Sequence, residues 1–287
     1  MLAELLALLA SFIFASSSIL LKKGLKFADV TSAAFFSTII QTIIIWIPAL
    51  LFVPFNLLFS EANLLFILSG AFTSFVGVQL TFIAVDRAGV SIAYPIIATQ
   101  PLYSTLIAAM LLREQITIFI GVGTVLIVIG VALLSYGKKG SKEWKKIGIA
   151  AALLSAFVYA FSAIPRKVGF NIVNAPNFPI LGTAVEMSTG LMCYSLYFAF
   201  LRKEPLFNRK SLSFFSFYGL AITVSSLFIL FALSFGKVIT VSPLFNTYPL
   251  FTLFLAYLFL GKIEKITAKI IVCTLLIVSG SALIVIS

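Results

Sequence analysis

The sequence contains little charge, no histidine and few cysteines. Charged residues make up 10% of the chain and hydrophobic residues 61%, whereas soluble domains contain roughly 25% and 45–50%. A soluble globular domain is therefore excluded. Because histidine is absent, the chain has no histidine zinc site and no Ser-His or Cys-His nucleophile pair. We therefore expect no metal, no cofactor and no catalysis.

Other chemical signatures are missing as well. Cys193 and Cys273 each lie within an apolar run, and two such cysteines do not make a disulfide framework. No glycine-rich Walker loop with Lys-Ser or Lys-Thr is present, which excludes direct use of ATP. The basic residues form short clusters between apolar runs, a pattern that fits membrane orientation better than a nucleic-acid surface.

Long apolar runs fill most of the chain. A membrane-spanning helix needs about 20 mostly apolar residues, and the run that follows Met1 has no signal-peptide cleavage pattern. The sequence therefore predicts an all-α polytopic membrane protein with ten transmembrane helices. These spans are residues 3–21, 31–53, 64–84, 91–112, 116–136, 147–165, 178–200, 213–235, 238–260 and 267–286.

Two of these spans carry paired prolines at matching places. Pro95 and Pro101 recur 148 residues later as Pro243 and Pro249. A proline inside a helix removes a backbone hydrogen bond, and lipid tolerates the freed groups only where protein or a water-filled cavity satisfies them. Interrupted spans in corresponding positions of two halves indicate a transporter binding site.

The similarity between the halves extends beyond the prolines. Three pairs are separated by 145 residues: Phe14 and Tyr159, Lys22 and Lys167, and Gln41 and Glu186. The repeating unit contains five spans, and an odd number forces the two copies to cross the membrane in opposite directions. We expect two inverted five-helix repeats, residues 1–137 and 147–287, joined by a basic loop at 138–146.

The positions of the basic residues predict the orientation. If residue 1 is outside, 16 of the 20 basic residues lie in inside connections and 4 in outside connections. Cytoplasmic loops carry the excess of Lys and Arg, so both termini should lie outside. A reporter fused after Ser287 and active only outside should give signal. Strong signal from a reporter that works only in the cytoplasm would reverse the orientation.

Glu186 is the acid that we expect to lie well inside a span, about 12 Å from its start at 1.5 Å per residue. Intramembrane acids are costly and usually face an interior cavity. Glu186 is therefore a candidate for pairing with a substrate or exchanging protons, the alternative being a structural hydrogen bond. Gln41 occupies the equivalent position in the other repeat. Its buried amide could contact the substrate or make a hydrogen bond between helices.

The remaining candidates lie near the prolines and at span ends. Polar side chains between the prolines offer donors and acceptors without fixed charge, and helix-kink packing is the alternative. For a lysine at a span end, the two alternatives are binding of an anion and extension of the side chain to the membrane interface. For three tyrosines, the alternatives are stacking on an aromatic ligand and packing against neighbouring helices. The candidates are Thr99, Gln100, Asn246, Thr247 and Tyr248; Lys22 and Lys167; and Tyr94, Tyr103 and Tyr159.

The first span of each half follows one pattern, which reads Phe14-Ala15-Ser16-Ser17 to Lys22 and again Tyr159-Ala160-Phe161-Ser162 to Lys167. In this pattern the chain resembles the drug/metabolite transporter superfamily, and specifically its ten-span EamA-type members. The pattern of the fourth and fifth spans resembles Pro101 to Thr117. Its second copy departs from the family, because Lys262 stands where an acid is expected.

The resemblance implies a carrier with alternating access. Its substrates would be amino acids, nucleotide sugars, phosphorylated sugars or drugs. Family members are usually drawn with cytoplasmic termini, whereas the count of basic residues places both termini outside. We expect a secondary transporter that works as a monomer in the plasma or inner membrane. Its partners would be a small polar substrate and protons, and the favoured function is export of an amino acid. A structural or partner-binding membrane protein is the alternative from another class.

Overall fold

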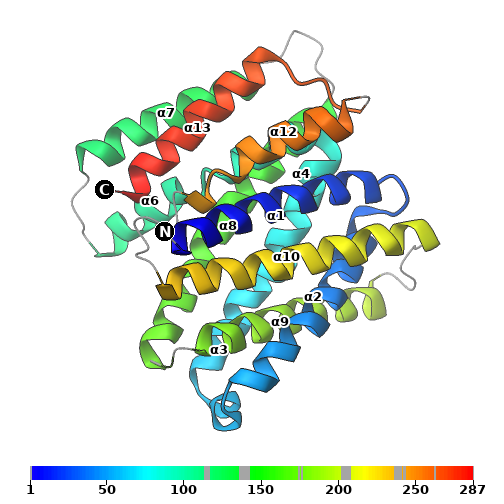
Figure 1. Ribbon diagram of the computed structural model, residues 1–287, viewed down its shortest axis with the longest axis vertical. Coiled ribbons are helices and arrows are strands. Elements are labelled where there is room, and N and C mark those ends of the chain that lie inside the picture. The colour runs from blue at the N-terminus through cyan, green and yellow to red at the C-terminus, as the bar shows by residue number, and fades with distance from the viewer. Residues whose placement is uncertain are drawn as a thin grey trace.

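The computed structural model describes residues 2–112, 117–135, 143–173, 175, 177–201, 208–235, 241, 244–261 and 263–286. All regular structure in these ranges is helical, without a strand (Figure 1). The prediction of an all-α membrane protein is therefore confirmed at this level.

The helices of the first half follow one another with short connections. The third predicted span is continuous but contains a π-helical turn, and the fourth is broken into two helices. The elements are α1 (Leu2–Gly24), α2 (Val30–Phe52), η1 (Phe55–Phe59), α3 (Ala62–Gly70), η2 (Ala71–Gly77), α4 (Val78–Ala88), α5 (Val90–Ile97), α6 (Gln100–Leu112) and α7 (Ile118–Ser135).

The second half has five helices among the described residues, which leave out most of 236–243. The elements are α8 (Glu143–Ile172), α9 (Phe178–Phe200), α10 (Arg209–Phe235), α12 (Tyr248–Leu260) and α13 (Ala268–Val285). Pro243 and Lys262 lie outside the described residues.

Six of the described helical runs are long and apolar enough to cross a membrane. They are Leu2–Gly24, Val30–Phe52, Ala62–Ala88, Lys145–Ile172, Arg209–Ala232 and Ala268–Val285, with two shorter apolar helices at Ile118–Leu134 and Tyr248–Leu260. Many large side chains on them are exposed, such as Leu51 at 71%. Apolar side chains on the outside and small or polar ones inside fit lipid as the surrounding solvent.

The helices pack as a bundle in which distant segments meet. In Figure 1, α1 lies between α10 and α12, and α7 lies beside α13 at one end of the bundle. At the other end α2 packs against α9 and α10. The long helix α8 contacts α3, α4, α5 and α6. Helices from both predicted halves therefore interleave around a common centre.

Both predicted boundaries of the sixth span are wrong. We expected the sixth span to end at residue 165 and a connection to begin at Arg166. In the structure α8 continues to Ile172, with Pro165 inside it. The helix also begins earlier than expected, at Glu143, so its first turn takes in the end of the predicted basic loop. Arg166 is therefore a residue of the bundle rather than one of the four basic residues in outside connections.

Candidate functional site

A cavity of about 300 Å³ lies at the centre of the bundle. Its walls come from α1, α2, η2, α4, α5, α6, α8, α9, α10 and residues 245–248, so both predicted halves contribute to it. Among the described residues, its charged side chains are Arg166 and Glu186, and its amides are Gln41, Gln100 and Asn246.

Arg166 and Glu186 form an ion pair in this cavity. Arg166 Nε donates to Glu186 Oε1 over 2.9 Å, and Nη2 donates to Oε2 over 2.8 Å. Two parallel N–H···O bonds of this kind fix both side chains in one geometry. The Glu186 side chain is 4% exposed and that of Arg166 37%, so the carboxylate is buried and the Arg166 side chain is partly exposed.

A third residue holds the carboxylate. Ser69 Oγ, at the end of α3, donates to Glu186 Oε1 over 2.6 Å. Directly after it, the π-helical turn η2 places Thr73 and Ser74 in the cavity wall. Such turns inside α-helices are rare and frequently mark functional sites. The acid is therefore preorganised by α3 and α8 rather than free in the cavity.

Two glycines let the backbones approach at this point. A Cβ at Gly70 would lie 2.6 Å from the carbonyl oxygen of Glu186, and a Cβ at Gly190 would overlap Ser74. Both glycines are buried between α9 and the α3–η2 segment. Small residues at such crossings are what allow membrane helices to pack closely. This close packing sets the depth at which Glu186 enters the cavity.

The proline-interrupted segment of the first half is broken as expected. α5 ends at Ile97, two residues turn, and α6 begins at Gln100. The carbonyl oxygen of Ala98 in the turn accepts a hydrogen bond from Ser281 Oγ of α13 over 2.7 Å. The protein thus satisfies a backbone group that lipid could not, and Gln100 reaches the cavity.

The corresponding segment of the second half also turns before its helix. Thr247 N donates to Leu244 O over 3.3 Å, and α12 begins at Tyr248 with Pro249 in its first turn. A proline is tolerated there because the first-turn N–H has no helical partner. Asn246 and Tyr248 line the cavity from this turn.

Three aromatic rings of the cavity wall contact one another. The ring centroids of Phe14 and Tyr94 are 5.7 Å apart, those of Phe14 and Tyr248 4.8 Å, and those of Tyr94 and Tyr248 6.0 Å. All three contacts are edge-to-face, a favoured arrangement. The cavity wall therefore contains an ion pair and a cluster of aromatic rings.

The structure brings most of the predicted site residues together and leaves others aside. The cavity is lined by Gln41, Tyr94, Gln100, Tyr159, Glu186, Asn246 and Tyr248. Tyr159 O–H is 3.1 Å from Thr81 Oγ1, and Gln41 Nε2 donates to Ser37 O.

The other predicted side chains point elsewhere. Thr99 and Thr247 donate to carbonyls three residues earlier, Tyr103 packs edge-to-face on Phe157, and none of the three lines the cavity. Lys22 Nζ donates to Val85 O and Asp86 O over 2.8 and 3.0 Å. The side chain of Lys167 lies outside the described part of the chain.

Sequence reasoning missed Arg166 and the η2 residues. Arg166 follows Pro165, a helix-boundary signal, and this favoured a loop. The separation of Arg166 and Glu186 along the chain could have indicated the pair. This separation of 20 residues is enough for the end of one helix, a turn and two helical turns of the next helix, so the two side chains can meet. The π turn lies between Gly70 and Gly77, but glycines in an apolar run indicate close packing as readily as a change of helix type.

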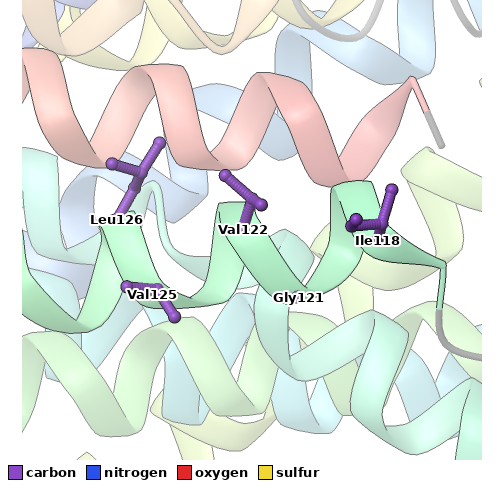
Figure 2. Close-up of a pocket in the computed structure, with 5 residues that line it drawn as sticks. All are labelled: Ile118, Gly121, Val122, Val125 and Leu126. Atoms are coloured by element: carbon purple, nitrogen blue, oxygen red, sulfur yellow. The ribbon is translucent and has the colours of Figure 1, made fainter.

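A second hollow lies on the surface of α7. It is lined by Ile118, Gly121, Val122, Val125 and Leu126, and Figure 2 shows these side chains on the helix beside α13. Ile118 is 77% exposed. A binding site needs a few placed polar groups, and this lining has none, so we assign it to the lipid-facing surface.

A helical bundle with an apolar exterior and a central cavity that holds an ion pair and is lined from both halves is typical of integral membrane transporters. The chain belongs to the EamA-like transporter family, whose model matches residues 1–136 and 146–286, and so to the drug/metabolite transporter superfamily that the sequence resembles.

One relative agrees with this assignment, and one solved structure shares the fold. A protein of Archaeoglobus fulgidus named only as an uncharacterized transporter is 23% identical over 272 residues, covering 94% of this chain and 93% of that protein. A solved crystal structure of a protein 16% identical superposes with a TM-score of 0.59 and covers 98% of this chain and 95% of its own. That second likeness concerns the fold alone.

Proposed function

We propose that the protein is a secondary transporter that carries a zwitterionic amino acid, in the direction of export, by alternating access. The observation that carries the substrate class is the Arg166–Glu186 pair in the cavity wall. A guanidinium pairs with a carboxylate through two N–H donors, and a carboxylate accepts from an ammonium. An amino acid brings both of these groups on one carbon.

The rest of the cavity fits the rest of such a substrate. Ligand pockets usually have volumes of about 300–1,000 Å³, and this cavity, at about 300 Å³, lies at the small end. The ring cluster of Phe14, Tyr94 and Tyr248 offers an apolar wall for a side chain. Gln41, Gln100 and Asn246 offer neutral hydrogen bonds.

The charges of the cavity disfavour the in-family alternatives. A phosphorylated sugar or nucleotide sugar carries net negative charge and needs more cations than acids, yet the described lining has one of each. A cationic drug brings no carboxylate, so Arg166 would lose its partner if Glu186 turned to the drug. A partner-binding role gives no reason for a charged cavity inside the bundle.

The helix contacts support the ten-span inverted repeat as the machinery for transport. If α1 and α8 are equivalent first spans, the contact of α1 with α10 corresponds to that of α8 with α3 and α4. The contact of α1 with α12 likewise corresponds to that of α8 with α5 and α6. Such halves can rock around a fixed site. We propose that a monomer in the plasma or inner membrane does this, with protons as the coupling ion.

The substrate class can be tested with purified protein in detergent. A ligand that binds the folded state raises the melting temperature by mass action. Free amino acids should raise it. The matched amino acid amides, which lack the carboxylate, and N-acetyl amino acids, which lack the ammonium, should not.

Counterflow into proteoliposomes would then separate binding from transport. Entry of a labelled amino acid driven by the same unlabelled amino acid inside is the expected result. Stabilisation by a nucleotide sugar or a phosphorylated sugar in place of amino acids would favour the other carrier class. No stabilisation by any of these would remove the support for the substrate.

A further inference from the structure

Glu264 lies in the connection between α12 and α13, and it bonds to the start of α5 in the other half of the chain. Its Oε1 accepts from Val90 N over 2.9 Å, and its Oε2 accepts from Ser91 N over 3.0 Å and from Ser91 Oγ over 2.7 Å. Three donors around one carboxylate make a charge-assisted cap for a helix N-terminus. This contact joins the two halves directly.

The preceding turn is shaped to receive this carboxylate. Gly89 has φ +84°, a conformation that side chains other than glycine rarely adopt. A Cβ at this position would lie 2.7 Å from the carboxyl carbon of Glu264. Glycine therefore serves both the turn between α4 and α5 and the close approach of the acid.

A second charged residue secures the other side of the same turn. Lys22, at the end of α1, donates through Nζ to the carbonyls of Val85 and Asp86 at the end of α4. The turn at Gly89 is thus held at the C-terminus of α4 by a lysine and at the N-terminus of α5 by a glutamate. Both interactions are electrostatically favourable at those helix ends.

The residues beneath this turn are closed to solvent. Phe82, Val85, Val90 and Ala93 are fully buried, and Leu260 is 1% exposed. At the other end of the cavity, the Arg166 side chain is 37% exposed. We call the side of the bundle with the 25–29 turn, Gly89 and residues 263–267 the Gly89 face. The cavity is closed toward this face and more open toward the end of α8.

We propose that Glu264 is the latch of a gate on the Gly89 face. Opening this face separates α5 from the α12–α13 connection, and the three hydrogen bonds of Glu264 must break for that to happen. α5 also carries Tyr94 and leads to Gln100 of the cavity wall, so its release couples the gate to the site. The latch requires a carrier that alternates between two faces, but not a particular substrate.

The test measures access to two introduced cysteines without any substrate. The native Cys193 and Cys273 are first replaced by serine. Ala93→Cys reports the Gly89 face, because Ala93 is buried beneath the turn. Ser226→Cys reports the opposite opening, because Ser226 lines the cavity on α10. A membrane-impermeant maleimide is added to protein in lipid nanodiscs, where both faces are reachable.

With Glu264→Gln, labelling at position 93 should rise about tenfold and labelling at position 226 should fall, since a shift between two states moves both. Ser91→Ala, which removes one of the three bonds, should give a smaller change in the same direction and keeps the test available if the first variant does not fold. Glu61→Gln is the matched control, because Glu61 stands at the N-terminus of α3 without a side-chain capping bond.

Each outcome has a definite meaning. A rise at 93 with a fall at 226 supports the latch. A rise at 93 alone means that Glu264 only prevents local fraying of α5, and it overturns the gate. Unchanged labelling at both positions in folded Glu264→Gln and Ser91→Ala protein overturns it as well. Failure of amino acids to bind would leave the labelling result intact, so the two proposals fail separately.

Discussion

Glu186→Gln is expected to lower the transport rate about 10- to 100-fold, the size of one lost hydrogen bond to a charged group. The amide keeps the shape of the side chain and an acceptor for Ser69, but it cannot pair with a substrate ammonium. The rate is measured by counterflow in proteoliposomes. Glu61→Gln, a change of the same kind at an exposed acid, should leave the rate unchanged.

The same substitution should also lower the stability of the fold. Removing one partner of a buried ion pair costs about 3–5 kcal/mol because a charge is left unpaired. The Arg166 side chain is 37% exposed to the cavity, so water solvates part of the charge and we expect a loss of about 1–2 kcal/mol. Thermal unfolding in detergent measures this loss.

Substitution of the partner separates the two effects. Arg166→Lys keeps the charge but gives up the bidentate geometry, so it should retain stability better than transport. Reversal of the pair, Arg166→Glu with Glu186→Arg, should recover stability relative to either single variant without recovering transport. Wild-type transport by Glu186→Gln would contradict a substrate-reading role and leave the pair structural.

The coarse fold could be predicted from the sequence because lipid imposes simple rules. Long apolar runs must be helical in a membrane, and the proline pairs indicated where helices break. The structure has the break between Ile97 and Gln100 where Pro95 and Pro101 predict it. The ends of the helices could not be predicted as well, because a proline does not always end a helix. Pro165 lies inside α8, which continues to Ile172.

The side-chain partners could not be predicted in the same way. Glu186 was expected to pair with a substrate, to exchange protons or to make a structural hydrogen bond, and no basic residue of the chain was predicted as its partner. Its partner Arg166 became visible only once α8 was known to continue past Pro165. Thr99 and Thr247 occupy the predicted turns, yet they bond to their own backbone. Composition and spacing do not say which way a short polar side chain turns.

The packing of Gly70 against α9 was also beyond the sequence. A glycine in an apolar run indicates close approach, but only the fold identifies what approaches. Here it is the backbone of Glu186 itself, the residue on which the proposed substrate site depends. The position of the acid is therefore set by a contact with another helix and not by its own segment.

Gly70→Ala is accordingly expected to damage both the fold and the site. Its Cβ would meet the carbonyl oxygen of Glu186 at 2.6 Å and its Cα at 2.7 Å. These are backbone atoms that cannot turn aside, so α3 and α9 must separate. Overpacking of this kind costs about 1–3 kcal/mol. It also moves the carboxylate away from Arg166 and Ser69, and transport should fall about tenfold or more, as displaced functional groups commonly show.

Gly121→Ala is the matched control for this substitution. A Cβ at Gly121 meets nothing within 4 Å, and alanine is the better helix former, so stability should change by less than about 1 kcal/mol and transport should not change. Thermal unfolding and counterflow are measured on both variants. Equal behaviour of the two alanines would mean that α3 and α9 tolerate the added carbon. In that case the close approach at Gly70 does not set the position of Glu186.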